Sequence, residues 1–169
     1  MRVVISGIAA VTPPGEATQE QALDLLVCTA GLSGEKLRLA RAIFERSGIE
    51  RRASVLGDGA AAQAFYASNA APPGTAARMA LYALHAPPLA QRACEAALHA
   101  GASPASAITH LVTASCTGFG SPGVDIDLVE RLGLRPDVRR VHVGFMGCHA
   151  ALNALSVASA RSRSRRSAR

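Results

Sequence analysis

The sequence predicts an α/β fold, and two observations lead to this fold class. In the second half of the chain, segments with a strand pattern alternate with segments with a helical pattern, in the order strand, helix, strand, helix. This order is typical of parallel strands joined by right-handed crossovers. The chain also has 169 residues, of which 49% are hydrophobic and 18% charged. It therefore has the size and composition of one domain with a hydrophobic core.

The N-terminal part of the chain predicts one strand followed by two helices. The β-branched, apolar run at residues 2–11 predicts a buried strand, which a Pro-Pro-Gly turn ends. Residues 16–29 and 35–47 have helical patterns, and each is closed by a glycine. The second of these helices is expected to be amphipathic, with one apolar face formed by Leu37, Ala40 and Phe44.

The middle of the chain gives weaker signals. Residues 50–56 predict a short strand, and the alanine-rich residues 57–74 predict a loop. Residues 75–100 have a helical pattern, but Pro87 and Pro88 interrupt it. Because proline removes a backbone N–H and clashes with the preceding turn, this helix is predicted to be kinked or split.

The last third of the chain carries the clearest alternation. Residues 108–114 and 139–145 predict strands, and residues 123–133 and 148–160 predict helices. No glycine-rich phosphate-binding fingerprint accompanies them.

The net charge of +6 is concentrated at one end of the chain. Five of the 18 basic residues lie in residues 161–169, and the rest of the chain has 13 basic and 12 acidic residues. We therefore predict a nearly neutral folded domain at 1–158 and a basic, solvated, disordered tail at 159–169, without specific nucleic-acid binding. Nonspecific contact of the tail with phosphates is the alternative.

Membrane and secretion signals are absent from the sequence pattern. No run of about 18 uncharged apolar residues occurs, and the N-terminus lacks the features of a signal peptide. A cytoplasmic protein that does not bind membranes is therefore expected. The four cysteines, Cys28, Cys94, Cys116 and Cys148, are widely spaced and form no Cys/His grouping, so we expect reduced thiols and no metal site.

Cys148 has a physical reason to be reactive. It follows a predicted strand and opens a predicted helix, where free amides and the helix dipole stabilise a thiolate. Gly147 before it allows a sharp turn and a close approach by a substrate. The helix carries small residues that would let it pack closely on its neighbours, namely Ala150, Ala151 and Ala154.

A strongly ionised cysteine also needs a cationic partner, which is normally a histidine. His149 is a poor partner, because adjacent helical side chains point about 100° apart. The remaining histidines are expected to be structural residues of strands or surface residues of a helix, namely His110, His142, His85 and His99. On these arguments alone, Cys148 and Cys116 are as well explained as small buried apolar residues.

The sequence of residues 108–155 resembles the type III polyketide synthases, the chalcone and stilbene synthase family, in their bacterial branch. The segments "THL", "SPGVD", "LGLRP" and "RVHVGFMGC" recur in the order and with the spacing of that family. A weaker likeness extends through "GIERR" and "ARMALYALHAPPLA", so that it covers nearly everything before about residue 158.

This resemblance implies a thiolase-like fold, of which the chain would form the N-terminal half of the layered αβαβα architecture, usually in a homodimer. It implies an acyltransferase that loads an acyl group from acyl-CoA onto a cysteine. The acyl chain is then extended with malonyl-CoA by decarboxylative Claisen condensation. Coenzyme A thioesters are substrates, and no permanently bound cofactor is implied.

The resemblance also assigns roles to residues. The family's nucleophile falls on Cys148, and Cys116 falls on a residue that lines the substrate pocket. Ser121 falls on the position that in plant members reaches the partner subunit's cavity. Arg46 falls on a basic position that holds coenzyme A, whereas two further basic positions are occupied by Leu39 and Ala42.

The chain departs from the family in length. Relatives are roughly twice as long, and their catalytic histidine and asparagine lie in the half without a counterpart here. We therefore expect a truncated or frame-shifted synthase that is inactive alone and that pairs with a missing C-terminal half. A ketoacyl carrier-protein synthase and a noncatalytic remnant or interaction module with a basic tail are the alternatives.

Overall fold

The computed structural model describes residues 3–67 and 72–164. The chain divides into two compact units. We call Thr12–Arg78 the N-terminal unit, and the N-terminal segment up to Val11 together with the chain from Met79 onward the C-terminal unit. Each unit is described by itself.

The C-terminal unit is built on two parallel strands. Strand β3 (His110–Ser115) pairs with β4 (Arg139–Gly144) in a register that runs from His110 opposite Arg139 to Ser115 opposite Gly144. Helix α5 (Val124–Arg131) connects them, and helix α6 (Ala150–Ser164) follows β4. The predicted alternation of strand and helix and the predicted parallel pairing are both confirmed.

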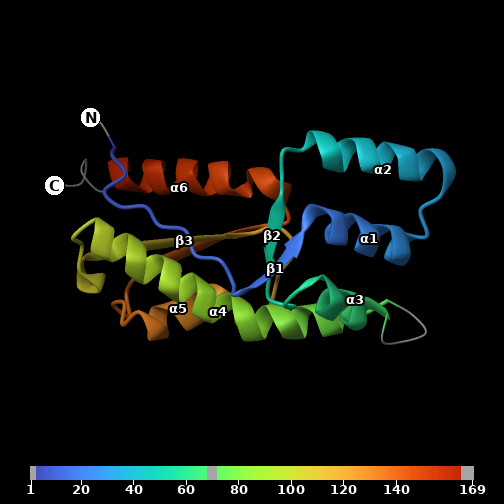
Figure 1. The fold of residues 1–169 in the computed structure, drawn as a ribbon. Coiled ribbons are helices and arrows are strands. Elements are labelled where there is room, and N and C mark those ends of the chain that lie inside the picture. Colours follow the sequence, from blue (N-terminus) through green and yellow to red (C-terminus); the bar gives the residue numbers. More distant parts are fainter. Residues whose placement is uncertain (1–2, 68–71, 165–169) are drawn as a thin grey trace. The chain divides into compact units, whose positions relative to one another are not determined.

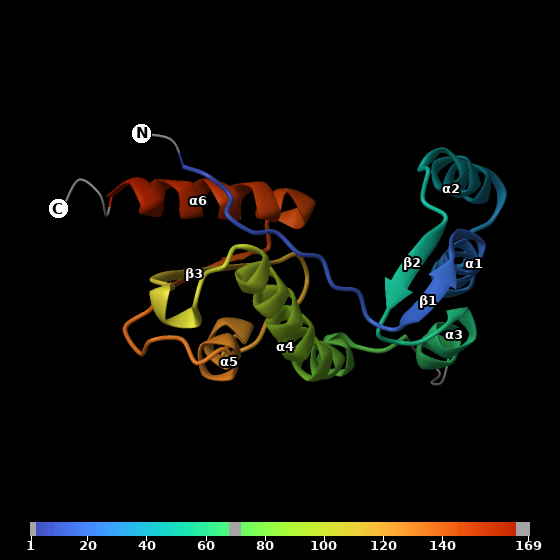
Figure 2. The ribbon, with the colours of Figure 1, turned by 60° about the vertical axis from the view of Figure 1, so that its left-hand side comes forward.

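Helices cover both faces of this sheet. In Figures 1 and 2, α6 lies along one face, and α5 with α4 (Thr75–Ala100) lies on the other. Leu128 of α5 is only 2% exposed, because α5 packs against both strands. Further buried apolar residues of this unit are Leu134, Val138 and Ala150. This arrangement is the layered α/β packing that the sequence predicts.

The N-terminal unit combines a small antiparallel sheet with three helices. Strand β1 (Gly15–Thr18) pairs with β2 (Arg51–Ser54), and these strands are accompanied by α1 (Gln19–Ala30), α2 (Gly34–Arg46) and α3 (Gly59–Ala67). Both predicted helices and the predicted short strand are therefore present. On α2 the predicted apolar face is turned inward, since Ala40 is buried and Leu37 and Phe44 are half-buried.

Local capping explains where α1 begins and ends. The Thr18 hydroxyl accepts a hydrogen bond from the Gln21 N–H at 3.1 Å, and the Gln21 side chain accepts one from the Thr18 N–H at 2.9 Å. This reciprocal pair is a capping box. At the other end, Gly31 adopts a left-handed conformation with φ 60°, which glycine tolerates without a steric penalty.

The predicted buried strand at residues 2–11 is wrong in the part that the structure describes. Residues 3–11 are irregular, and Val4, Ile5 and Ile8 are 76%, 71% and 80% exposed. A β-branched apolar run becomes a strand only where another strand offers its backbone groups, and β3 and β4 pair only with each other in the described ranges. The segment instead passes the end of α4, where Gly7 lies against Ala97 and Gly101.

One prediction about helices fails, and another fails in part. The predicted loop at 57–74 contains α3, which is favoured by its alanines and begins where the Asp58 carboxylate accepts a hydrogen bond from the Ala61 N–H at 2.9 Å. Helix α4 is continuous through Pro87 and Pro88, so the predicted split is wrong, whereas the predicted kink stays a prediction. The φ angle of proline suits a helix, so each proline removes a hydrogen bond without ending the helical path.

The predicted boundary at residue 158 does not coincide with the end of a helix. Helix α6 continues through Ser164, so that residues 159–164 of the predicted disordered tail are helical. Alanine and arginine both have high helix propensity, which explains the extension. Residues 165–169 of that tail lie outside the described residues. Within the described ranges, no helix combines the length and apolar character that crossing a membrane requires.

Candidate functional site

The structure brings Cys116 and Cys148 to the same edge of the parallel sheet. Cys116 directly follows Ser115, the last residue of β3, and Ser115 is paired with Gly144, the last residue of β4. After β4 the chain turns back through a short 3₁₀ helix, Gly147–His149, and α6 then packs against β3. Ligands of open α/β sheets bind outside the carboxyl ends of the strands, and both cysteines lie there.

The two thiols interact. Desolvation raises the pKa of the Cys116 thiol, and a side-chain hydrogen bond with Cys148 and the charge of Cys148 raise it further. Both cysteines are free and exposed to solvent. The alternative that they are small buried apolar residues is therefore wrong for both, and a reagent in solution can reach either sulfur.

The backbone before Cys148 adopts two left-handed residues in a short space. Phe145 has φ 58° and Gly147 has φ 66°. A residue other than glycine in this region carries strain of about 1–3 kcal/mol, and such strain gathers at functional sites. Gly147 makes the turn without that cost, and a Cβ atom built on it would have no atom within 4 Å. The predicted turn at Gly147 is confirmed, and the space beside it is open.

Cys148 lies in the 3₁₀ helix Gly147–His149, and α6 begins two residues later, at Ala150, so that Cys148 does not itself open the α-helix as predicted. The first amides of α6 have no intrahelical carbonyl partner. Ala150 is buried, as expected of a small residue that lets the helix approach the sheet. Ala154 is half-buried, but Ala151 is exposed, so Ala151 does not share the predicted packing role. Its side chain simply falls on the outer side of the first turn.

An apolar rim beside the cysteines was not predicted from the sequence. The rings of Phe119 and Phe145 lie 5.6 Å apart between centroids and are inclined by 48°. Both rings and Met146 are exposed. The Phe119 N–H also donates a hydrogen bond to the Met79 sulfur at 3.4 Å, which anchors this loop to α4. The available signal was spacing, since each phenylalanine lies three residues from a cysteine.

The two histidines nearest to Cys148 in the sequence form hydrogen bonds with other side chains. The Nδ1 atom of His149 lies 3.1 Å from the side chain of Asn153 in α6, and Nδ1 of His142 lies 2.9 Å from the Thr113 hydroxyl. The prediction that His149 is a poor partner agrees with this geometry. His142 is a hydrogen-bonded residue of a strand, as expected.

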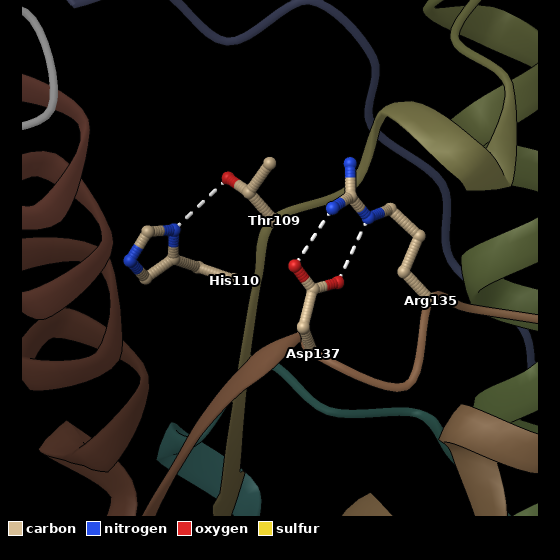
Figure 3. Close-up of polar contacts among 4 residues, drawn as sticks. All are labelled: Thr109, His110, Arg135 and Asp137. Atoms are coloured by element: carbon tan, nitrogen blue, oxygen red, sulfur yellow. Dashed lines mark hydrogen bonds and ion pairs between the residues drawn. The ribbon is translucent and has the colours of Figure 1, made fainter.

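His110 lies at the opposite end of the sheet. It begins β3, and six residues of extended chain place it about 20 Å from Cys116. Figure 3 shows its Nδ1 beside the Thr109 hydroxyl at 3.0 Å, near the paired Arg135 and Asp137 side chains. The Arg135 guanidinium donates two hydrogen bonds to the Asp137 carboxylate, at 2.8 and 2.7 Å. These contacts stabilise the turn before β4, at the end of the sheet opposite to the cysteines.

Ser121 lies on the loop that connects β3 to α5, which also carries Cys116. Ser121 is exposed. The loop is fixed at its far end by Asp125, whose carboxylate forms an ion pair with Arg140 of β4. A Cβ atom on Gly123 would meet the Asp125 carboxylate at 2.6 Å, so the "SPGVD" turn closes tightly around that side chain.

Arg46 belongs to the N-terminal unit. It lies in the last turn of α2 and is exposed. Leu39, at the second predicted coenzyme A position, is exposed too, and Ala42 at the third is half-buried. In the described ranges, no three His, Cys, Asp or Glu side chains come together in a way that could hold a metal ion.

Comparison with known proteins places this geometry in a family. Residues 8–169 match the family "Chalcone and stilbene synthases, N-terminal domain". The alpha-pyrone synthesis polyketide synthase-like protein of Mycobacterium tuberculosis is 38% identical over 156 residues, which is 92% of this chain and 39% of that protein. The chain thus spans about two fifths of the length of this relative.

Solved structures agree with this match. A polyketide synthase from the brown alga Ectocarpus siliculosus has a TM-score of 0.70 at 31% identity, over 89% of this chain and 41% of that chain. The structure of CsyB complexed with CoA-SH has a TM-score of 0.75 at 27% identity, over 90% of this chain and 39% of that chain. The predicted thiolase-like α/β fold is confirmed, and a ketoacyl carrier-protein synthase is not favoured. The chain belongs to the chalcone and stilbene synthase family, of which it carries the N-terminal domain.

Proposed function

We propose that this chain provides the acyl-accepting cysteine of a type III polyketide synthase. In this proposal Cys148 is the nucleophile that takes an acyl group from a coenzyme A thioester. The observation that carries it is the position of Cys148, which is exposed, follows the left-handed Gly147 and lies in the 3₁₀ turn that leads into α6 at the carboxyl edge of the sheet. The family match supports the same assignment.

The loading step is a thioester exchange. The Cys148 thiolate attacks the carbonyl carbon of the acyl-CoA, a new carbon–sulfur bond forms, and the bond to the coenzyme A sulfur breaks. The departing coenzyme A sulfur takes up a proton. The open space beside Gly147 admits the thioester.

The neighbouring side chains suit the hydrocarbon part of such a substrate. The exposed Phe119, Phe145 and Met146 border the cysteines, and apolar surface of this kind binds an acyl chain by removing it from water. We propose that Cys116 lines the same pocket and that Ser121 serves at the subunit boundary of a dimer.

Extension with malonyl-CoA requires groups beyond those found here. The enolate formed by decarboxylation needs hydrogen-bond donors, and the thiolate needs an ion-pair partner. The hydrogen bonds of His142 and His149 go to Thr113 and Asn153 rather than to Cys148. We therefore propose that condensation depends on a polypeptide equivalent to the remaining three fifths of the relatives, and that loading does not.

Coenzyme A recognition is assigned to α2. Arg46 is exposed and basic, and the similar CsyB has been solved with CoA-SH. We propose that Arg46 contacts a phosphate of the carrier. Replacing it in Arg46→Ala should raise the acyl-CoA concentration needed for half-maximal loading, whereas Arg38→Ala, which changes another exposed arginine of the same helix, should leave that concentration unchanged.

The free thiols of this site fit a reducing cytoplasm, which is the location we propose.

Mass spectrometry of the intact chain tests the loading step. The chain is incubated with acetyl-, hexanoyl- and lauroyl-CoA, and adducts are located by peptide mapping. We expect one acyl group on Cys148, lost in Cys148→Ala and retained in Cys28→Ala. An adduct that forms equally on Cys28, or none with any thioester, would refute the proposal. Adding malonyl-CoA with the separately expressed C-terminal portion of the Mycobacterium tuberculosis relative then tests extension.

A further inference from the structure

Two cysteines lie at one edge of the sheet, and the proposed acyl transfer needs only one of them. Cys116 and Cys148 are 32 positions apart in the sequence, yet the strand register places their chains side by side at Ser115 and Gly144. Neighbouring strands lie about 4.8 Å apart, so the two segments that carry the cysteines leave the sheet from adjacent points, and the Cys116 and Cys148 side chains form a hydrogen bond beyond its edge.

The chain around each sulfur leaves it free to move. Cys116 begins the loop after β3, and Cys148 lies in the 3₁₀ turn after β4, so neither side chain is fixed within a strand. Both are exposed, and their side chains already interact. Because the two side chains are already hydrogen-bonded, a disulfide requires only a further approach of the two sulfur atoms.

We propose that Cys116 and Cys148 form a dithiol that a hydroperoxide converts reversibly into an intramolecular disulfide. The Cys148 thiolate attacks the peroxide, the O–O bond breaks, and Cys148 becomes a sulfenic acid. The Cys116 sulfur then attacks the Cys148 sulfur, an S–S bond forms, and the sulfenic oxygen leaves as water with the Cys116 proton. Two thiols lose two electrons in total, and one hydroperoxide is reduced to water and the corresponding alcohol, or to two waters if it is hydrogen peroxide.

The environment of Cys116 assigns it the second step. Because desolvation and the neighbouring Cys148 raise the pKa of Cys116, its sulfur stays protonated when the pair first meets an oxidant. A protonated thiol is a weak nucleophile toward peroxide. Once Cys148 is a neutral sulfenic acid, its charge no longer opposes ionisation of Cys116, and attack on the adjacent sulfur follows.

The other two cysteines lack such a neighbour. Cys94 is half-buried in α4, where burial and then Glu95 raise the pKa of its thiol. Cys28 is exposed on α1 of the N-terminal unit. Cys28 is therefore the matched control, because it shares the exposure of Cys148 but has no adjacent thiol in the described part of the chain.

The disulfide would switch the acyl acceptor off and protect it. A sulfur in a disulfide cannot accept an acyl group, and it is not oxidised further to the irreversible sulfinic acid. Only this consequence for loading rests on the proposed function of Cys148. The disulfide itself depends only on the two sulfurs.

Peptide mapping after oxidation tests the proposal. The reduced full-length chain is treated with hydrogen peroxide, quenched with iodoacetamide and digested without reduction, with cleavage after Glu95 to separate Cys94 from Cys116. We expect a linked pair of peptides that carry Cys116 and Cys148, in the wild type and in Cys28→Ser alike. Dithiothreitol should remove the link and restore acyl loading in full.

The Cys116→Ser variant gives the opposite expectation. It should form no link, and its Cys148 should accumulate sulfinic acid that dithiothreitol does not reverse. Because this variant could misfold, phenylarsine oxide provides a measurement on the wild type, since one arsenic atom bridges two adjacent thiols. It should block alkylation of Cys116 and Cys148 together and leave Cys28 reactive.

Two results would overturn the proposal. One is accumulation of sulfinic acid on wild-type Cys148 without any linked peptide, and the other is linkage between separate chains instead of within one. If the disulfide forms but no acyl adduct is ever found, the redox pair stands and the loading role of Cys148 falls. If loading occurs but no disulfide forms, the loading role of Cys148 stands and the proposed redox pair is wrong.

Discussion

Ser115 and Gly144 face each other at the last position of two parallel strands, and the chain beyond each of them leads to a cysteine. The register of this one pair determines that Cys116 and Cys148 share an edge of the sheet. A shift of the pairing by one residue would turn every side chain of one strand to the other face. The site therefore depends on strand pairing as much as on the residues themselves.

Removal of Cys148 should make Cys116 more acidic. A side-chain hydrogen bond and the charge of Cys148 are among the causes that raise the pKa of Cys116. In Cys148→Ala both causes vanish, so the pKa of Cys116 should fall and its thiolate should appear at lower pH. The rate of iodoacetamide labelling of Cys116, followed by mass spectrometry across a pH series, measures this shift. A profile identical to that of Cys28→Ala would show that the two thiols do not interact.

The sequence predicted the local features of this site but not its assembly. Cys148 stood out because a glycine, a preceding strand and a following helix are visible within ten residues. The contact with Cys116 was not visible, because it is made by the pairing of β3 with β4 over 32 positions of sequence. The rim formed by Phe119 and Phe145 was missed for the same reason, since their ring contact joins two different loops.

The failed predictions have two different physical causes. The apolar residues 3–11 match the pattern of a buried strand, but a pattern reports what a segment can bury and not whether a partner strand exists. Conversely, the glycines on both sides of α3 led to the prediction of a loop, although its alanines favour a helix and Asp58 caps it. Tertiary pairing decided the first case, and a side-chain cap decided the second.

Gly147→Ala should destabilise the fold through backbone strain alone. Gly147 has φ 66°, and a Cβ atom there would meet no other atom within 4 Å. The cost is therefore the left-handed conformation of an alanine, about 1–2 kcal/mol, with no added clash. Urea unfolding of the purified chain measures it. Gly120→Ala is the control, because its φ is not positive and its Cβ would make an ordinary contact at 3.6 Å.

Loading of acyl-CoA should fall in the same variant, because Gly147 shapes the turn that presents Cys148. If Gly147→Ala unfolds at the same urea concentration as the wild type, the left-handed turn is not what holds the cysteine in place.

Asp125→Asn should loosen the loop that carries Ser121. The Asp125 side chain is 15% exposed and pairs with Arg140, whose side chain is 38% exposed. A partly buried, charge-assisted contact of this kind is worth about 1–2 kcal/mol. The variant should lower the free energy of unfolding by that amount and increase proteolytic cleavage between Cys116 and Gly123.

Glu16→Gln provides the comparison for this ion pair. Glu16 pairs with Arg51 on the surface of the N-terminal unit, where both side chains are largely exposed. Such a pair contributes about 0–0.5 kcal/mol, so its loss should hardly change stability. Equal effects of the two substitutions would mean that the Asp125 contact does not anchor the loop.

The exposed apolar side chains should make the chain associate. Leu152 and Leu155 lie on α6 and are 66% and 56% exposed, and apolar surface of this kind is normally covered by another polypeptide. We expect sedimentation velocity to show species larger than a monomer, in proportions that rise with protein concentration. The double variant Leu152→Glu and Leu155→Glu should shift this distribution toward the monomer without lowering the melting temperature, because neither side chain is buried within its own chain.

Leu128→Ala is the control and should lower stability and promote aggregation. It removes a side chain that is only 2% exposed, which should cost about 2–5 kcal/mol. A wild-type chain that sediments as a single monomeric species at every concentration would show that α6 needs no cover, and the role proposed for a complementary polypeptide would then lose its structural basis.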